Sequence, residues 1–228
     1  MFGTIVRTSA LICFGIVFAT PSSPAALVST TFTLIAPSAP SNELSLTLLD
    51  GMDTTQLSGT FQATLDIDQV TGTITSIDMT AGSIVTSDWN MTVTGIGAVV
   101  GSGINATVDT PTPPGGVTGT TFNATQHQVI LNTGLVTAAG NPVQDFATTP
   151  LPIPGTGNGT ITSTLNGGVF DISLDMPINS TQVVAGQNLL IVGNLVGTAQ
   201  VTAVPEPSSV FVLALFAAGF GLVRKRVA

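Results

Sequence analysis

The sequence predicts an all-β fold, with an antiparallel β-sandwich or barrel-like body between two apolar terminal segments. Short runs of alternating apolar and polar residues recur through the middle of the chain, and turns containing glycine or asparagine separate them. No window in this middle part shows a helical period. Aromatic residues make up only 5% of the chain and Tyr is absent, so small aliphatic side chains must supply the core. Many short strands at regular intervals are typical of sandwiches and barrels.

The clearest predicted strand is 59–68, in which the alternating residues Phe61, Ala63, Leu65 and Ile67 share one face. Residues 69–72 predict a turn, and 73–79 the return strand. The same alternation runs through 89–93 and 170–176. Further strands are expected at 28–35, 44–49, 128–132, 189–192 and 195–202. Two proline-rich stretches, 110–116 and 149–155, are expected to be surface connections, because proline lacks the donor that a central strand needs.

Charge is distributed very unevenly along the chain. All four basic residues lie near the ends, whereas 27–204 contains no Lys or Arg and eleven of the twelve acidic residues. This pattern excludes nucleic-acid binding, which needs a basic surface to displace counterions. Since the carboxylates lack basic partners, we expect them to repel one another, so that added salt and mild acidification should both stabilise the fold. The one cysteine, Cys13, precedes this stretch, which leaves the body without a thiol.

Residues 1–26 predict a secretory signal peptide. Arg7 supplies a positive charge, 10–19 are continuously apolar, and a small, proline-containing stretch follows. The apolar run is shorter than the roughly 20 residues of a membrane-spanning helix. Ser23 and Ala25 fit the small-x-small pattern before a cleavage site, so cleavage is expected after Ala25 or Ala26. The secretion translocon is therefore an expected partner.

The C-terminal segment 204–228 combines three features. Pro205-Glu206-Pro207 predicts an extended segment, because proline fixes φ and lacks a backbone donor. The apolar stretch 208–223 is expected to form a transmembrane helix, although at 1.5 Å per residue it falls short of a bilayer core of about 30 Å. The basic residues Arg224, Lys225 and Arg226 then form a membrane stop that stays on the cytoplasmic side.

This tail resembles the PEP-CTERM sorting domain of exported bacterial surface proteins, whose three elements it contains in the same order and at the usual spacing. The resemblance implies recognition by an exosortase, a membrane-embedded transpeptidase-like enzyme, and processing near the motif. It also makes extracellular polysaccharide a candidate partner, since many such proteins accompany its production. We therefore expect a protein anchored in the membrane through its C-terminus and then, after processing, located at the cell surface or outside the cell. The resemblance is limited to the tail and implies nothing about 27–203.

The body offers few groups for chemistry, and we predict no catalytic residue and no cofactor. His127, the only imidazole, is expected to be an exposed strand or loop residue. Asp66 and Asp68 share one strand face, as do Asp171 and Asp175, but a glycosidase pair needs carboxyl groups about 5 to 9.5 Å apart and aromatic residues for sugar stacking are scarce. Asp66 and Asp68 are candidate calcium ligands, as are the carboxylates of 50–53, although calcium needs six to eight oxygens.

The sequence thus divides into a signal peptide (1–26), a β-rich extracytoplasmic domain (27–203) and a sorting segment (204–228). The leading hypothesis is a non-catalytic, structural or adhesive protein of the cell surface or of an extracellular biofilm matrix. A carbohydrate- or calcium-binding β-module is the first alternative, and a glycoside hydrolase is the second. A calcium-dependent rise in Tm would favour the first alternative, and hydrolysis of a polysaccharide would favour the second.

Overall fold

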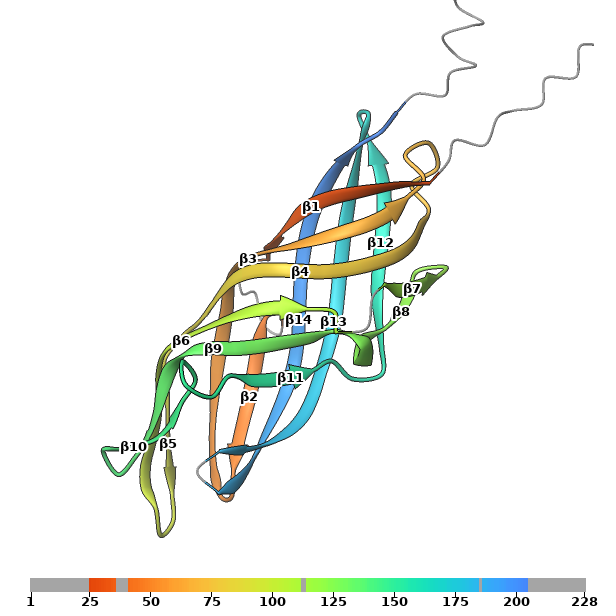
Figure 1. The fold of residues 1–228 in the computed structure, drawn as a ribbon. Helices are drawn as coiled ribbons and strands as arrows, with labels where there is room; N and C mark the ends of the chain where they lie inside the picture. The colour runs from red at the N-terminus through yellow and green to blue at the C-terminus, as the bar shows by residue number, and fades with distance from the viewer. Residues whose placement is uncertain (1–24, 36–40, 112–113, 185, 205–228) are drawn as a thin grey trace, which may run out of the picture. The chain divides into compact units, whose positions relative to one another are not determined.

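The structure, a computed structural model, describes residues 25–35, 41–111, 114–184 and 186–204, all within the larger of the chain's two compact units, Ser23–Glu206. In these residues there are fourteen strands, one 3-10 turn and no α-helix (Figure 1). The elements are β1 (Ala26–Leu34), β2 (Glu43–Leu48), β3 (Gly51–Ile67), β4 (Ile74–Thr86), β5 (Trp89–Val93), β6 (Gly97–Asp109), β7 (Gly115–Thr118), β8 (Thr121–Asn123), η1 (Ala124–Gln126), β9 (Gln128–Ala138), β10 (Asn141–Asp145), β11 (Leu151–Pro154), β12 (Asn158–Asn166), β13 (Val169–Val184) and β14 (Gln187–Thr202).

The predicted antiparallel, all-β character is confirmed, since every strand pair among the described residues is antiparallel. The alternation read in the sequence also corresponds to burial. The apolar residues of the predicted 59–68 and 170–176 strands are all buried, and their polar neighbours lie on the opposite face. The turn between β3 and β4 lies where the sequence predicts it, with Gly72 N–H donating to the Asp68 carbonyl over 2.7 Å.

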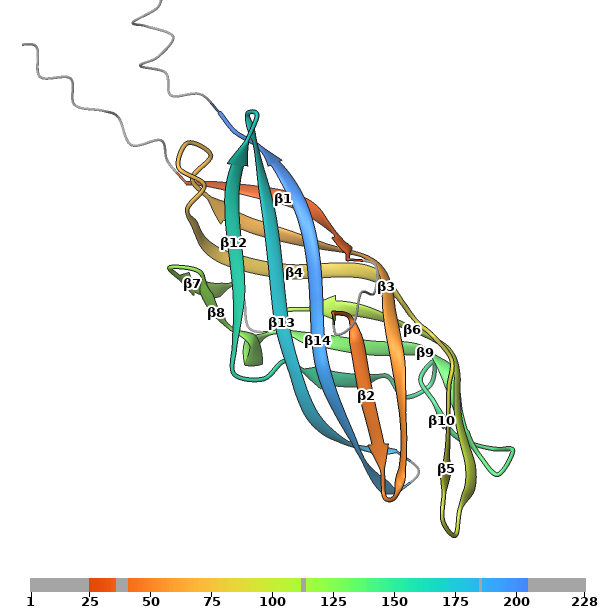
Figure 2. The same cartoon turned by 180° about the vertical axis from the view of Figure 1, so that it is seen from behind.

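The strand pairing closes on itself. β3 pairs with β2, and the ladder continues through β14, β13, β12, β8, β7 and β4, which pairs with β3 again. β6 extends from β4 and leads to β9, which pairs with both β10 and β11. The long strands β12, β13 and β14 run side by side in both views (Figure 2). A closed ladder leaves few free edges, and edges are where strands of other molecules would pair.

The core is built from aliphatic side chains around a few rings. All five described phenylalanines are at most 2% exposed, and Phe32 of β1 stacks on Phe61 of β3 with ring centroids 4.9 Å apart. Gly197 of β14 faces this pair, and a Cβ at that position would lie 3.1 Å from Phe61. The glycine therefore lets β14 approach the stacked rings closely.

Asn42, just before β2, bridges β14 and the end of β1 at the point where the neighbour of β14 changes from β2 to β1. β14 pairs with β2 up to Gly193 and with β1 from Gly197, which leaves 194–196 between the two pairings. The Val196 carbonyl accepts the Ile35 N–H over 3.2 Å, and the Asn42 side chain supplies the other contacts: its Oδ1 accepts from Val196 N–H over 2.7 Å, and its Nδ2 donates to the Val196 carbonyl over 2.8 Å. Nδ2 also donates to the Ile35 carbonyl over 2.9 Å. Asn42 is fully buried, and its φ of 58° is one that asparagine tolerates better than most residues.

Two expected boundaries are corrected by the structure, and one strand, β6, was not expected. The expected strands 189–192 and 195–202 are one strand, β14, because Gly193 allows close contact with β2: a Cβ there would lie 2.2 Å from the Glu43 carbonyl oxygen. Within the expected connection 149–155, Leu151–Pro154 forms β11, which pairs only with β9 and so tolerates its prolines as an edge strand. Strand β6 was not predicted, because its buried positions change from odd to even numbers across a bulge at Gly103.

Candidate functional site

The predicted processing sites lie at or beyond the limits of the described residues. Ser23 is outside the described residues, Ala25 is the first described residue, and Ala26 begins β1. The sorting motif Pro205-Glu206-Pro207, the expected helix 208–223 and the basic stop Arg224-Lys225-Arg226 are likewise outside them. The last described residue, Val204, donates its N–H to the Gln69 carbonyl over 3.0 Å. Within the described ranges, no helix has the length and hydropathy needed to cross a membrane.

His127 is fully buried, which corrects the expectation of an exposed histidine. It follows η1, and its ring packs edge-on against Phe122 with centroids 5.2 Å apart. Nδ1 lies 2.9 Å from Thr110 Oγ1, which accepts the Met79 N–H over 2.7 Å. The Thr110 hydroxyl can therefore donate its proton to Nδ1. The neutral ring then carries its proton on Nε2, which has no hydrogen-bond partner among the described residues. Burial lowers the pKa of His127 to about 4.

This histidine is therefore a structural residue. Met79 pairs with Ala63 of β3 on one edge of β4, but on the other edge it lies between the pairings with β7 and β6 and has no strand beside it. There the Thr110 hydroxyl accepts the Met79 N–H, and His127 supports that hydroxyl. A Cβ at Gly115 of β7 would lie 2.6 Å from Nε2, so the strand covers the second ring nitrogen closely. With both nitrogens enclosed, the imidazole has no access to an external substrate.

Several carboxylates act as acceptors for the protein's own hydrogen bonds. Asp50 accepts the Thr94 N–H over 3.0 Å, and hydrogen bonding from the Thr94 side chain and backbone lowers the pKa of Asp50. Asp53 accepts the Asn90 N–H over 2.6 Å. Both contacts join the β2–β3 hairpin to β5 and to the residue that follows it. The carboxylates of 50–53, which the sequence offered as calcium ligands, thus already have backbone partners.

Asp66 and Asp68, the other calcium candidates, also have partners of their own. Asp66 Oδ2 accepts from the Thr75 hydroxyl over 2.9 Å. Asp68 Oδ1 accepts the Val70 N–H over 2.9 Å, and this bond, more than that from Thr71, lowers the pKa of Asp68. Among the described residues no group of three or more His, Cys, Asp or Glu side chains could hold a metal ion.

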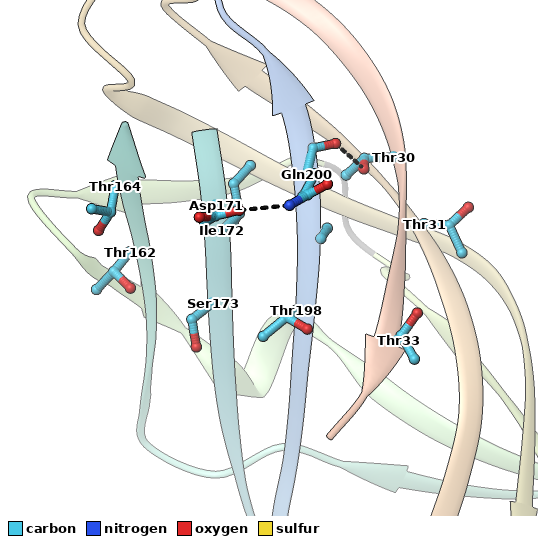
Figure 3. A pocket seen from close by; sticks show the side chains of 11 residues that line it. Thr30, Thr31, Thr33, Thr162, Thr164, Asp171, Ile172, Ser173, Thr198 and Gln200 are labelled. Atoms are coloured by element: carbon cyan, nitrogen blue, oxygen red, sulfur yellow. Dashed lines mark hydrogen bonds between the residues drawn. The ribbon is translucent and has the colours of Figure 1, made fainter. Parts of the chain in front are cut away.

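The outer face of β12, β13 and β14 carries two adjoining hollows. The larger, of about 750 Å³, lies between these strands and β1 and is lined mainly by threonines, with Ser173, Asp171 and Gln200 (Figure 3). The smaller, of about 420 Å³, contains Asp175 and Asn194. Both hollows are open, and their walls are the polar side chains that alternate with the buried residues of these strands.

Amide side chains hold the two aspartates of these hollows in place. Gln200 Nε2 donates to Asp171 Oδ1 over 2.8 Å, and Asn166 Nδ2 donates to Asp171 Oδ2 over 3.2 Å. Asn194 Nδ2 donates to Asp175 Oδ1 over 3.0 Å. The aspartates lie four residues apart on one face of β13, which separates their Cα atoms by about 13 Å. The sequence placed them on one face correctly, and each carboxylate accepts a hydrogen bond from an amide side chain of the protein.

A row of hydroxyl groups crosses the same outer face. The register places six Ser and Thr residues opposite one another on six successive strands: Thr162, Ser173, Thr198, Thr33, Thr60 and Ser83. Neighbouring strands lie about 4.8 Å apart, so these hydroxyls repeat at that interval. The sequence shows alternating threonines in 31–33 and 160–164, but it does not show that strands so far apart are neighbours.

No protein-family model matches this sequence, and no curated protein and no solved structure matches it either.

Proposed function

We propose that this chain is an exported cell-surface or extracellular-matrix protein, structural or adhesive and non-catalytic, that an exosortase sorts through the C-terminal tail. The observation that carries the adhesive role is the hydroxyl row on the outer face of the sheet. Hydroxyl groups at regular spacing suit contact with a hydrated polymer, whereas catalysis needs acids, bases or nucleophiles held together in a cleft. The one imidazole is enclosed, and the two aspartates of β13 already accept hydrogen bonds from amide side chains.

The export route is supported by the way the predicted processing sites relate to the strands. Cleavage after Ala25 leaves β1 complete, since that strand begins at Ala26. The sorting motif begins at Pro205, three residues after β14 ends at Thr202. Cleavage after Ala25 therefore removes no described strand residue, and cleavage after Ala26 removes only the pairing of Ala26 with Ile67 at the start of β1. Processing at the sorting motif leaves β14 complete.

We further propose that the body is sandwich- or barrel-like. The closed circuit of strand pairs supports this architecture. So does a narrow apolar cavity of about 30 Å³, where Leu46 of β2 and Ile191 of β14 line one side and Leu131 of β9 and Ile153 of β11 are also in its wall. Apolar residues from opposite parts of one ladder share a core in both architectures.

A carbohydrate-binding module is the second candidate function, and the two hollows of the outer face favour it. A glycoside hydrolase is less well supported, because Asp171 and Asp175 already accept hydrogen bonds from amide side chains. For calcium, Asp66 and Asp68 offer oxygens that already accept hydrogen bonds from nearby residues, so an ion would have to compete with those bonds.

The experiment that tests the sorting role changes Glu206→Ala in the native host. A protease reads an extended backbone and a particular side chain, whereas a simple anchor needs only an apolar helix and a basic stop. We therefore expect the variant to accumulate as a full-length precursor in the membrane fraction, while the wild-type protein is shortened and released from it. Ser209→Ala, three residues further along, is the matched control and should be processed normally. Equal masses and equal membrane fractions for wild type and Glu206→Ala would show that the tail is only an anchor.

A further inference from the structure

We propose that the outer face of β12, β13, β14 and β1 binds a polysaccharide of amino sugars that carry protonated amines. This inference rests on the proposed matrix role, because it names the kind of polymer that such a role requires. The larger hollow supplies hydroxyl groups and Asp171 (Figure 3). The smaller one continues the same face with Asp175. An extended polymer that follows β13 would reach both.

The charge of the body decides which polymers can bind. The stretch 27–204 has eleven carboxylates and no Lys or Arg, so it repels an anionic polysaccharide at every approach. A polymer with spaced ammonium groups is attracted by the same field. Electrostatic complementarity of this kind favours the cationic partner and rejects anionic ones.

The aromatic residues argue against a neutral polymer. Sugars without charge are commonly held by stacking on exposed rings, but all five described phenylalanines are buried and Trp89 is only 6% exposed. Recognition on this face must therefore come from hydrogen bonds and charge. Ser173, Thr162 and Thr198, directly opposite one another on three strands, can donate to and accept from sugar hydroxyls.

The two aspartates are suited to bind ammonium groups. Each is half-buried and held by side-chain amides, so the carboxylates keep their orientation without a bound ligand. Each oxygen has more than one acceptor site, which leaves acceptor capacity for an N–H of the ligand. Charge-assisted bonds of this type are stronger than neutral ones. Two such sites about 13 Å apart on one strand can act on a single chain, and the second contact then benefits from a high effective concentration.

The test is co-sedimentation of the full-length protein, in neutral detergent and at a mildly acidic pH that protonates the amines, with cross-linked chitosan that stays insoluble when charged, and with cellulose as the neutral polymer. We expect binding to chitosan that weakens with added salt, and little binding to cellulose. Asp171→Asn together with Asp175→Asn should weaken chitosan binding at least about fivefold, because two exposed charge pairs are lost. Asp88→Asn together with Asp145→Asn removes the same charge from exposed positions outside these strands and should change binding less than twofold.

A third variant, Thr162→Val with Thr198→Val, removes two hydroxyls with little change of shape and should also weaken binding. Circular dichroism and urea denaturation of each variant show whether the fold is kept. The proposal is overturned if both double aspartate variants bind alike, if cellulose binds as well as chitosan, or if neither polymer binds. Those results would leave the sorting role untouched, since that role is judged separately by the processing of Glu206→Ala.

Discussion

At the scale of single residues, two buried polar side chains solve the same problem. Where a strand changes partner, backbone groups on that edge have no neighbouring strand, and an unpaired buried group costs about 1 to 3 kcal/mol. Asn42 satisfies Val196 of β14, and the Thr110 hydroxyl, backed by His127, satisfies Met79 of β4. Neither role is visible in the sequence, because both depend on which strands separate at that point.

The first prediction concerns Asn42→Ala. The change removes three hydrogen bonds, leaves the Val196 N–H without its side-chain acceptor and places alanine at a φ of 58°. We expect the free energy of unfolding to fall by about 3 kcal/mol, measured by urea denaturation. Asn42→Gly separates the causes, since glycine adopts this φ without strain but makes no side-chain bond. A glycine variant as stable as wild type would show that the hydrogen bonds contribute nothing.

At the scale of elements, strand segments with an unbroken alternation could be predicted most completely, whereas the bulged strand β4 could be predicted only over 73–79. β5 and the central part of β13 follow period two throughout, and both were predicted. β6 contains glycines, which have a low strand propensity, and its buried positions change from odd to even residue numbers at Gly103. Neither strand propensity nor a regular alternation therefore identifies it. Asp171 and Asp175 could be placed on one face because both lie in β13. The hydroxyl row could not be predicted, because Thr33 and Thr198 are neighbours only through the fold.

The second prediction concerns the pairing of β5 with β6. Trp89 lies opposite Gly101, and a Cβ on that glycine would lie 2.2 Å from the indole Cε2. Gly101→Ala should therefore displace the ring and lower the free energy of unfolding by about 2 kcal/mol, as overpacking does. Trp89 is the only Trp, so a red shift of the intrinsic fluorescence reports its exposure directly. Gly116→Ala, where a Cβ would meet nothing within 4 Å, is the matched control. Unchanged emission in Gly101→Ala would contradict the described packing.

At the scale of the whole molecule, the structure changes the expected response to acid. The sequence suggested that repulsion raises the pKa values of the carboxyl groups and that mild acidification stabilises the fold. Instead, hydrogen bonds lower the pKa of Asp50 and of Asp68. The stability that these two aspartates supply is present above their ordinary pKa near 4 and is lost as the pH falls below it. Screening by salt remains an expected stabilising effect, because the body has no basic side chain to oppose its carboxylates.

Protonation of His127 destabilises the fold at a milder pH than protonation of the two aspartates does. Burial lowers its pKa from 6.5 to about 4, so the unfolded chain takes up a proton more readily than the folded chain does. The stability due to the neutral imidazole is complete above pH 6.5 and is lost progressively as the pH falls from about 6.5 to 4. At 1.36 kcal/mol per pH unit, the loss over this interval approaches about 3 kcal/mol.

The last prediction therefore compares wild type with His127→Gln in urea denaturation between about pH 7.5 and 4.5. The wild-type midpoint should fall steadily below pH 6.5. The glutamine variant starts from a lower stability, because the ring packing against Phe122 is lost, but its midpoint should stay nearly constant over the same range. The slope with pH, rather than the stability itself, thus identifies the group that takes up the proton. A wild-type midpoint that rises on acidification to pH 4.5 would mean that carboxylate repulsion outweighs the buried histidine.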